Sequence, residues 1–278
     1  MKQKQYVYFF NTKKNTDGSA SMSNTLGGKG ANLAEMANLN IPVPPGFTIS
    51  TDVCVYYMNK GKYPPGCKKQ IKENLKKLEL CMNQKFGSKI NPLLLSVRSG
   101  ARQSMPGMME TVLNVGLTNN TILGLVEQTG NKRFVYDSYR RLIMMFADVV
   151  MEKSNNLNFD IRHLLEKTIN QYKLKNKIKN DINLSYDDLY KLCVAFQDIV
   201  SKVFNKPFPN DPLEQLQSSI EAVFKSWNGK RAVEYRKIEN IPNDWGTAVN
   251  VQAMVFGNMG SDCATGVAFT RNPSTGEN

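Results

Sequence analysis

A glycine-rich turn around Lys29 is the feature that most restricts how this chain can fold. Gly27, Gly28 and Gly30 surround the lysine, and a helix-like run follows immediately. Glycine permits a positive φ angle and lets the backbone approach a neighbour closely. A turn that opens into a helix also directs free N–H groups and the positive end of the helix dipole at one point, where Lys29 adds a full charge. The segment therefore predicts a phosphate-binding turn, with an ordinary surface turn as the alternative.

Strand-like segments flank this turn. Residues 5–10, rich in aromatic and β-branched side chains, predict a first strand, and residues 47–51 predict a second. A polar loop at 11–24 and a short helix from about 30 to 39 connect them. The proline-rich segment 41–47 ends that helix, because proline cannot continue it. The glycine turn is thus expected between two strands.

A continuous apolar run at 92–97 predicts a buried strand. It places Arg98 at or just past its end, followed by Ser99 and Gly100. A guanidinium group can pair with two phosphate oxygens at once, so Arg98 is a candidate phosphate ligand. A surface salt bridge is the alternative.

The next segment, residues 104–111, holds three methionines, one proline and one glycine, and its pattern fits neither a helix nor a strand. Methionine adapts to flat apolar surfaces, and loops that carry function are often mobile. We expect a mobile flap that covers a ligand. A buried loop that uses methionine as filler is the alternative.

Helical periodicity dominates the centre of the chain. Residues 65–86 form one predicted helix, and residues 121–204 are helical throughout. Ser185 followed by Asp188 predicts a capping box, and Asp211 before a proline predicts the start of a further helix. The buried stripe expected for that last helix consists of Leu213, Leu216, Ile220, Val223, Phe224 and Trp227.

The pattern changes again towards the carboxyl end. Residues 246–256 alternate between apolar and polar side chains, which predicts a half-buried strand. A turn at 257–262 and a second strand at 264–270 complete a predicted hairpin. A polar turn follows and no further strand comes after it, so we expect a sheet that is truncated at this point.

Composition narrows the function classes. The 278 residues, 41% hydrophobic and 22% charged, are typical of a globular protein with one large or two ordinary domains. No apolar run reaches the ~18 residues that a membrane span needs. Five scattered cysteines without metal or redox spacing indicate reduced thiols and a cytoplasmic location. The single histidine, His163, lies among ordinary helix residues and is expected to be structural.

The net charge of +12 and the pI of about 9.4 raise the question of nucleic-acid binding. The lysines are mixed with Asn, Gln and Glu in predicted helices, and the sequence has no arginine-rich tract, zinc-finger spacing or RNA-binding aromatic motif. We therefore expect neither a nucleic-acid partner nor a membrane partner. A substrate that carries phosphates would use some of the charge.

Several motifs together resemble the pyruvate, phosphate dikinase family of phosphoenolpyruvate-utilising enzymes. They follow the family's order along nearly the whole chain, and only the helical middle at 155–205 matches weakly. The motifs are Gly-Gly-Lys-Gly-Ala-Asn-Leu at 27–33, Pro-Val-Pro-Pro-Gly-Phe at 42–47, Ser-Val-Arg-Ser-Gly-Ala-Arg at 96–102, Ser-Met-Pro-Gly-Met-Met-Glu-Thr at 104–111, Tyr-Asp-Ser-Tyr-Arg-Arg at 136–141, Asp-Trp-Gly-Thr-Ala-Val-Asn-Val-Gln at 244–252 and Gly-Val-Ala-Phe-Thr-Arg-Asn-Pro at 266–273.

The resemblance implies an α+β fold, namely an ATP-grasp nucleotide-binding domain with an inserted helical subdomain, truncated before its last strands. It implies a first ATP-grasp subdomain with the turn and the flap at 1–118 and a helical subdomain at 119–206. A helix at 207–243 would return to the first subdomain. Residues 244–278 would begin a second ATP-grasp subdomain and leave it incomplete.

The resemblance also implies ligand-binding roles for individual residues. The family's lysine and arginine for the ATP phosphates fall on Lys29 and Arg98, in agreement with the interpretation of the turn and the strand. The flap is expected to close over the phosphates. Gln252 corresponds to a position near the adenine or its ribose, and Arg271 is a further candidate for the phosphates. The expected nucleotide-binding residues are Gly28, Lys29, Gly30, Arg98, Gly107, Met108, Thr111, Gln252 and Arg271.

In this family the domain passes a pyrophosphoryl group from ATP to a histidine on a separate swivelling domain, and phosphate and pyruvate then yield diphosphate and phosphoenolpyruvate. The family's Mg²⁺ carboxylates would follow Asn278, and its phosphohistidine has no counterpart here. We therefore expect ATP and Mg²⁺ as cofactors, with phosphate and pyruvate as the other substrates. A phosphohistidine domain is the expected partner, and the full-length enzyme is expected to be a homodimer. This chain alone should bind nucleotide weakly and turn nothing over.

Two alternatives stay open. Phosphoenolpyruvate synthase, glucan, water dikinase and antibiotic phosphotransferases share the same plan with another acceptor, although the runs at 105–109 and 272–277 favour pyruvate, phosphate dikinase. A basic, non-catalytic binding module would instead show salt-sensitive nucleic-acid affinity and no response to ATP.

Overall fold

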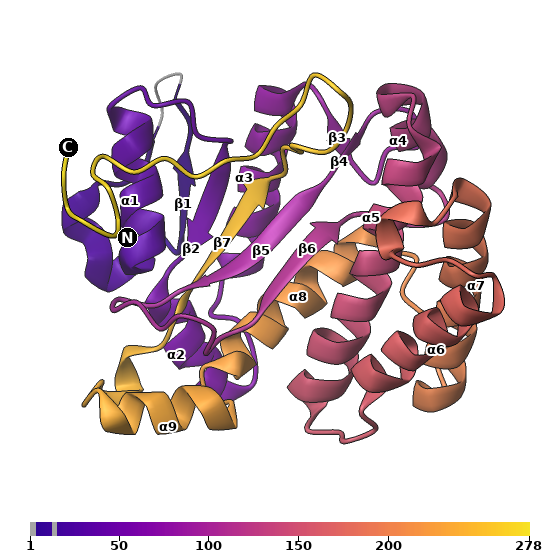
Figure 1. Ribbon diagram of the computed structural model, residues 1–278. Helices are drawn as coiled ribbons and strands as arrows, with labels where there is room; N and C mark the ends of the chain where they lie inside the picture. The colour runs from indigo at the N-terminus through magenta and orange to yellow at the C-terminus, as the bar shows by residue number, and fades with distance from the viewer. Residues whose placement is uncertain (1–3, 13–15) are drawn as a thin grey trace.

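The computed structural model describes residues 4–12 and 16–278, and within them the chain forms a five-stranded sheet with the order β1-β2-β7-β5-β6 (Figure 1). All neighbours in this sheet are antiparallel. Part of the predicted loop at 11–24, residues 13–15, lies outside the described residues. The strands are β1 (Val7–Phe10), β2 (Gly46–Ile49), β5 (Leu95–Gly100), β6 (Thr111–Val115) and β7 (Ala248–Ala253), with a separate parallel pair of β3 (Lys85–Phe86) and β4 (Pro92–Leu93).

The helices divide into those that cover the sheet and those that lie beyond its β6 edge. α1, α2, α3 and α8 contact sheet strands, whereas α4 to α7 gather beyond β6, with α5 against that strand (Figure 1). No helix in the described ranges has both the length and the apolar character to cross a bilayer. The helices are α1 (Ser23–Asn38), α2 (Thr51–Lys60), α3 (Cys67–Met82), α4 (Ile122–Thr129), α5 (Lys132–Phe146), α6 (Ile161–Lys175), α7 (Tyr186–Phe204), α8 (Pro212–Ser226) and α9 (Lys230–Ile238), and a π-helical segment, Ala147–Glu152, continues α5.

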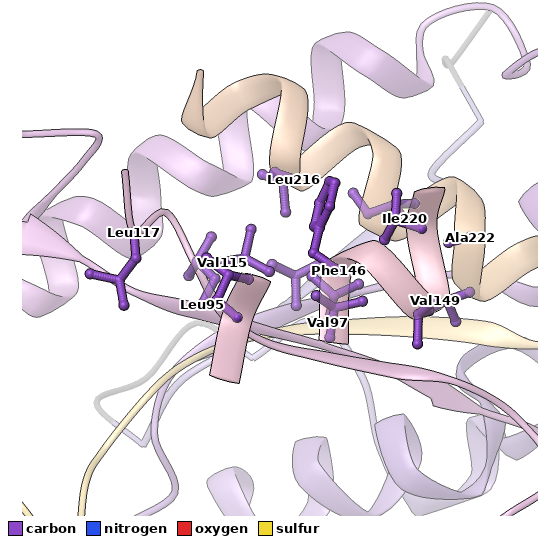
Figure 2. Packing of buried hydrophobic residues seen from close by; sticks show 14 of the residues in the cluster. Leu95, Val97, Val115, Leu117, Phe146, Val149, Leu216, Ile220 and Ala222 are labelled. Carbon is purple, nitrogen blue, oxygen red and sulfur yellow. The ribbon is translucent and has the colours of Figure 1, made fainter. Parts of the chain in front are cut away.

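One face of the sheet is apolar and forms the main core. Side chains alternate between the two faces along a strand, and cross-strand partners share a face. Val97 pairs with Val251, which in turn pairs with Phe47, and all three are fully buried. Helix α8 packs on this face, as Figure 2 shows for Leu95, Val97, Val115, Phe146, Leu216 and Ile220.

The opposite face carries a polar row. Thr48, Asn250, Arg98 and Thr111 are successive cross-strand partners on β2, β7, β5 and β6. Helix α1 lies on this face at very close range. A Cβ added to Gly30 would be 2.8 Å from Thr48 Cγ2 and 2.9 Å from Asn250 Oδ1. A larger residue at this crossing would push the helix off the sheet.

The predictions for the carboxyl end are partly wrong. β7 is buried along all six residues and not half-buried, because α1 contacts it from one face and α8 from the other. Residues 264–270 are exposed and form no strand. β7 already pairs with β2 on one side and with β5 on the other, so a hairpin partner would find no free edge.

Two predicted helix boundaries also move. α1 begins at Ser23, earlier than the predicted start near Gly30, breaks at Gly27 and continues to Asn38. α3 ends at Met82, before the predicted end at residue 86. The following Asn83 adopts the left-handed conformation that commonly closes a helix, and the chain then enters β3.

The structure confirms the two predicted helix caps. It does not confirm the predicted burial of one residue or the predicted end of one strand. Ser185 and Asp188 form a capping box at the start of α7, and Asp211 caps α8. Leu213, predicted to be buried, is 60% exposed because it belongs to the first turn of α8, ahead of the part that packs on the core. Thr51, predicted to end a strand, is instead the first residue of α2.

Phe146→Ala should lower the free energy of unfolding by about 3–5 kcal/mol, because it removes a 1%-exposed ring from the core in Figure 2. Chemical denaturation followed by circular dichroism measures the change. Phe269→Ala is the matched control. Phe269 is 66% exposed, so the same substitution should shift the free energy by less than about 0.5 kcal/mol. Equal effects of the two changes would contradict this placement of the core.

Candidate functional site

The glycine turn packs backbone to backbone against the end of β5. Gly27 has a φ of +67° and a ψ of 166°, which interrupts α1. A Cβ at Gly27 would lie only 1.7 Å from the Gly100 carbonyl oxygen, so no other residue fits there. The Gly28 N–H donates to the Ala101 carbonyl at 2.8 Å. The contact fixes the first turn of the continuing helix next to the point where β5 ends.

Lys29 and Arg98 both lie beside this turn. Arg98 is the fourth of six residues in β5, inside the strand and not at or past its end as predicted, and it shares a face with Gly100 two residues later. A Cβ added to Gly100 would be 3.7 Å from Lys29 Cβ, so the lysine side chain begins on the same face. The turn and the strand thus bring two cations from distant parts of the sequence to one place.

These two cations have no anionic partner in the part of the chain that the structure describes. No ion pair or hydrogen bond there engages the Lys29 ammonium or the Arg98 guanidinium. Packing around the ammonium lowers the pKa of Lys29 below its usual value, and the charge of Arg98 lowers it further. An anion between the two side chains would remove this unfavourable interaction.

Asn250 lies directly beneath the turn. It belongs to the motif at 244–252, but only Gln252 of that motif was expected to bind the nucleotide. Asn250 is 1% exposed, and Thr48 Oγ1 donates to its Oδ1 at 2.8 Å. Its Nδ2 has no acceptor among the described residues and would lie 2.6 Å from a Cβ added to Gly100. A buried donor without a partner costs about 1–3 kcal/mol, and a ligand that accepts its hydrogen bond would remove this cost.

The flap follows β5 and returns as β6. Its final residue, Thr111, opens β6 directly opposite Arg98. Met105 is buried at 6% exposure, and Met108 packs partly buried against the core. Gly107 has a φ of +71° with open space around it. The flap is therefore anchored by its methionines and by a strand, and its last residue, Thr111, lies opposite Arg98.

The remaining two predicted residues are placed differently. Gln252 lies on the same face as Asn250, one alternation further along β7, but it is 8% exposed and its Nε2 donates to the Pro44 carbonyl at 2.9 Å. Arg271 is exposed in the coil after β7, and its Nη1 donates to the Gly276 carbonyl at 3.2 Å. No contact within the described residues joins Arg271 to Lys29 or Arg98.

A cavity of about 800 Å³ opens beside the flap, between β6, α5 and α6. Its wall mixes acidic and basic side chains, among them Glu110 of the flap, Asp148, Lys153 and Arg231. Arg141 also lines it and forms an ion pair with Asp137 at 2.8 Å. The sequence offers no signal for this grouping, because its residues come from separate segments, and Arg231 lies more than a hundred positions from the flap.

The chain's carboxylates do not gather around the cations. Within residues 4–12 and 16–278, no three His, Cys, Asp or Glu side chains lie close enough together to hold a metal ion. His163, the only histidine, is exposed on α6. The described residues therefore do not fit a metal held by the protein.

Arg98→Met should raise the pKa of Lys29, because it removes a positive charge that disfavours the protonated lysine. The pKa should stay below its usual value, since burial of the ammonium remains. NMR of ¹³C-methylated lysines across a pH series measures this. Arg271→Met is the control and should leave the pKa unchanged, because Arg271 does not act on Lys29. An unaltered pKa in the Arg98 variant would show that the two side chains do not face each other.

Comparison with known proteins identifies the family. The profile described as "Pyruvate phosphate dikinase, AMP/ATP-binding domain" matches residues 23–80 and 65–278. The pyruvate, phosphate dikinases of Clostridium symbiosum and Rhizobium meliloti are 49% and 47% identical to the chain over 275 and 274 residues, which is 98% of the chain in each case. Pyruvate, phosphate dikinase 1, chloroplastic, of Oryza sativa is 49% identical over 99% of the chain. The chain spans about 30% of the length of these relatives, 28% for the rice protein. It belongs to the pyruvate, phosphate dikinase family and corresponds to its AMP/ATP-binding domain.

Proposed function

We propose that the glycine turn, Lys29 and Arg98 bind the phosphates of ATP. The observation that carries this proposal is a pair of cations that have no anionic partner among the described residues and lie beside a turn that only glycine can form. A phosphate chain would supply the missing negative charge, and the guanidinium group suits a two-oxygen contact. Membership of a family described as AMP/ATP-binding supports it.

Further residues of this chain would complete the site. Gly28 would leave the backbone of the turn accessible to phosphates, and Gly30 would contribute by letting the helix lie against Thr48 and Asn250. Gly107 and Met108 would cover the phosphates from the flap, and the Thr111 hydroxyl would reach them from beside Arg98. The orphaned Nδ2 of Asn250 supports the fit, because it leaves a buried donor beneath the turn.

The two remaining candidates need a local change before they can act. Gln252 would contact the adenine or the ribose only after its amide leaves the Pro44 carbonyl. Arg271 would reach the phosphates only if the coil that carries it moved towards the turn. Both are therefore proposed as contacts of the bound state.

We propose that the sheet with α1 and the flap forms the first subdomain of an ATP-grasp fold. Residues 119–206 would form the inserted helical subdomain, which is supported by the helices α4 to α7 beyond β6, and residues 207–243 would lead back to the sheet. Residues 244–278 would begin a second ATP-grasp subdomain, and β7 within them pairs with both β2 and β5 of the first sheet.

For the whole protein, we propose the activity that the relatives' names state. ATP, phosphate and pyruvate would be its substrates, and a phosphohistidine on another domain would accept the pyrophosphoryl group from ATP bound here. Mg²⁺ would arrive with the nucleotide, because the described residues offer no carboxylate cluster for it. A homodimer is proposed for the full-length enzyme. For the present chain by itself we propose nucleotide binding without turnover.

Mg-ATP should raise the melting temperature of the chain. Lys29→Ala should abolish the rise, because it removes one of the two positive charges that would bind the phosphates. A ligand present at 100 times its dissociation constant adds about 2.7 kcal/mol to the stability of the folded state. Differential scanning fluorimetry measures the shift. Lys60→Ala removes an exposed lysine at the end of α2 and should leave the rise intact. A rise that survives in the Lys29 variant would refute the assignment of the turn.

A further inference from the structure

Glu110, the last residue of the flap before β6, is held between cations from two other segments. Its Oε1 lies 3.1 Å from Arg231 Nη2 in α9 and 3.5 Å from Lys153 Nζ, just after the π-helical segment. Its backbone N–H donates to Ser226 Oγ at the end of α8, at 3.3 Å. One flap residue is therefore tied to three segments that lie outside the flap.

The ion pairs continue away from the flap. Lys153 also pairs with Asp148 at 2.9 Å, and Asp148 lies 3.6 Å from Arg162 of α6. The two carboxylates are little exposed, 19% for the Glu110 side chain and 9% for Asp148. Their cationic partners are 44–64% exposed, so water screens each pair in part, and Glu110 is held by two such pairs together with its backbone hydrogen bond. The series forms part of the wall of the 800 Å³ cavity.

Glu110 lies between the first residue of β6 and the turn of the flap. On its carboxyl side is Thr111, which is fixed in β6 opposite Arg98. On its amino side is the turn at Gly107, which has a positive φ and open space around it. Glu110 thus marks the boundary between the rigid strand and the part of the flap that can turn.

We propose that Glu110 is a positioning residue, which holds the flap beside the Lys29–Arg98 anion site through its ion pairs with Arg231 and Lys153. Its effect on the nucleotide rests on the function proposed above, whereas its effect on the flap does not. With the pairs intact, the turn is anchored at both ends, by Met105 in the core and by Glu110 in the ion pairs. Without these ion pairs, the segment from Gly107 to Glu110 is no longer attached to Arg231 and Lys153. The flap then covers a bound anion less completely.

Hydrogen exchange of the nucleotide-free protein tests the flap directly. Glu110→Gln keeps the shape of the side chain and removes its charge, so exchange at residues 104–110 should speed up about fivefold while the sheet stays protected. Arg231→Gln should also speed up exchange in the flap. The effect of the double variant on exchange should not exceed the sum of the two single effects, because both changes break the same Glu110–Arg231 pair. Glu73→Gln is the matched control. It breaks a pair with Lys69 on α3, which is separate from the series around Glu110, and should leave the flap unchanged.

Titration with Mg-ATP tests the consequence for the site. Glu110→Gln should weaken binding about fivefold and leave the pKa of Lys29 as it is, since the cations themselves do not move. Unchanged flap exchange, or faster exchange spread evenly over the sheet, would overturn the proposal in favour of general stabilisation. If the unaltered protein binds no Mg-ATP but its flap responds as expected, the positioning role stands and the nucleotide assignment fails.

Discussion

The structure depends on the close contact between the glycine turn and the sheet. Gly27 rests against the Gly100 carbonyl, and Gly30 rests against Thr48 and Asn250 at distances that leave no room for a Cβ. Helix α1 can therefore lie directly on the polar face of the sheet, and Lys29, in the first turn after the break at Gly27, comes beside Arg98. The lack of room for a Cβ at these glycines sets the geometry of the contact. The position of the two positive charges follows from that geometry.

The two faces of the sheet carry different roles because of the register of its strands. Val97, Val251 and Phe47 face α8 and contribute burial, whereas Thr48, Asn250 and Arg98 face α1. A shift of one residue in any pairing would exchange these rows. β7 holds the register from the centre, since without it the sheet would divide into β1-β2 and β5-β6. Both cations thus depend on a strand that lies at least 150 residues further along the chain.

Some charged side chains at the site are paired with an opposite charge and others are not. Lys29 and Arg98 have no counter-ion among the described residues, while the nearby cavity wall pairs its acids and bases closely, as in Glu110 with Arg231 and Asp148 with Lys153. Paired ions give a rigid frame, and unpaired cations give a place where an anion lowers the energy. The flap lies between the two regions and is bounded by Thr111 on one side and by the buried Met105 on the other.

Features that depend on near neighbours could be predicted from the sequence. These are the glycine turn, the buried strand that carries Arg98, and the caps at Ser185 and Asp211, because backbone freedom, apolar runs and capping act over a few residues. Three other features became visible only in the folded chain: β7 is a central strand without a hairpin partner, Asn250 lies beneath the turn, and Glu110 meets Arg231. The pairing of β7 with β2 and β5 and the contact of Glu110 with Arg231 join residues more than a hundred positions apart. Local periodicity does not predict which distant segment a strand or side chain will contact.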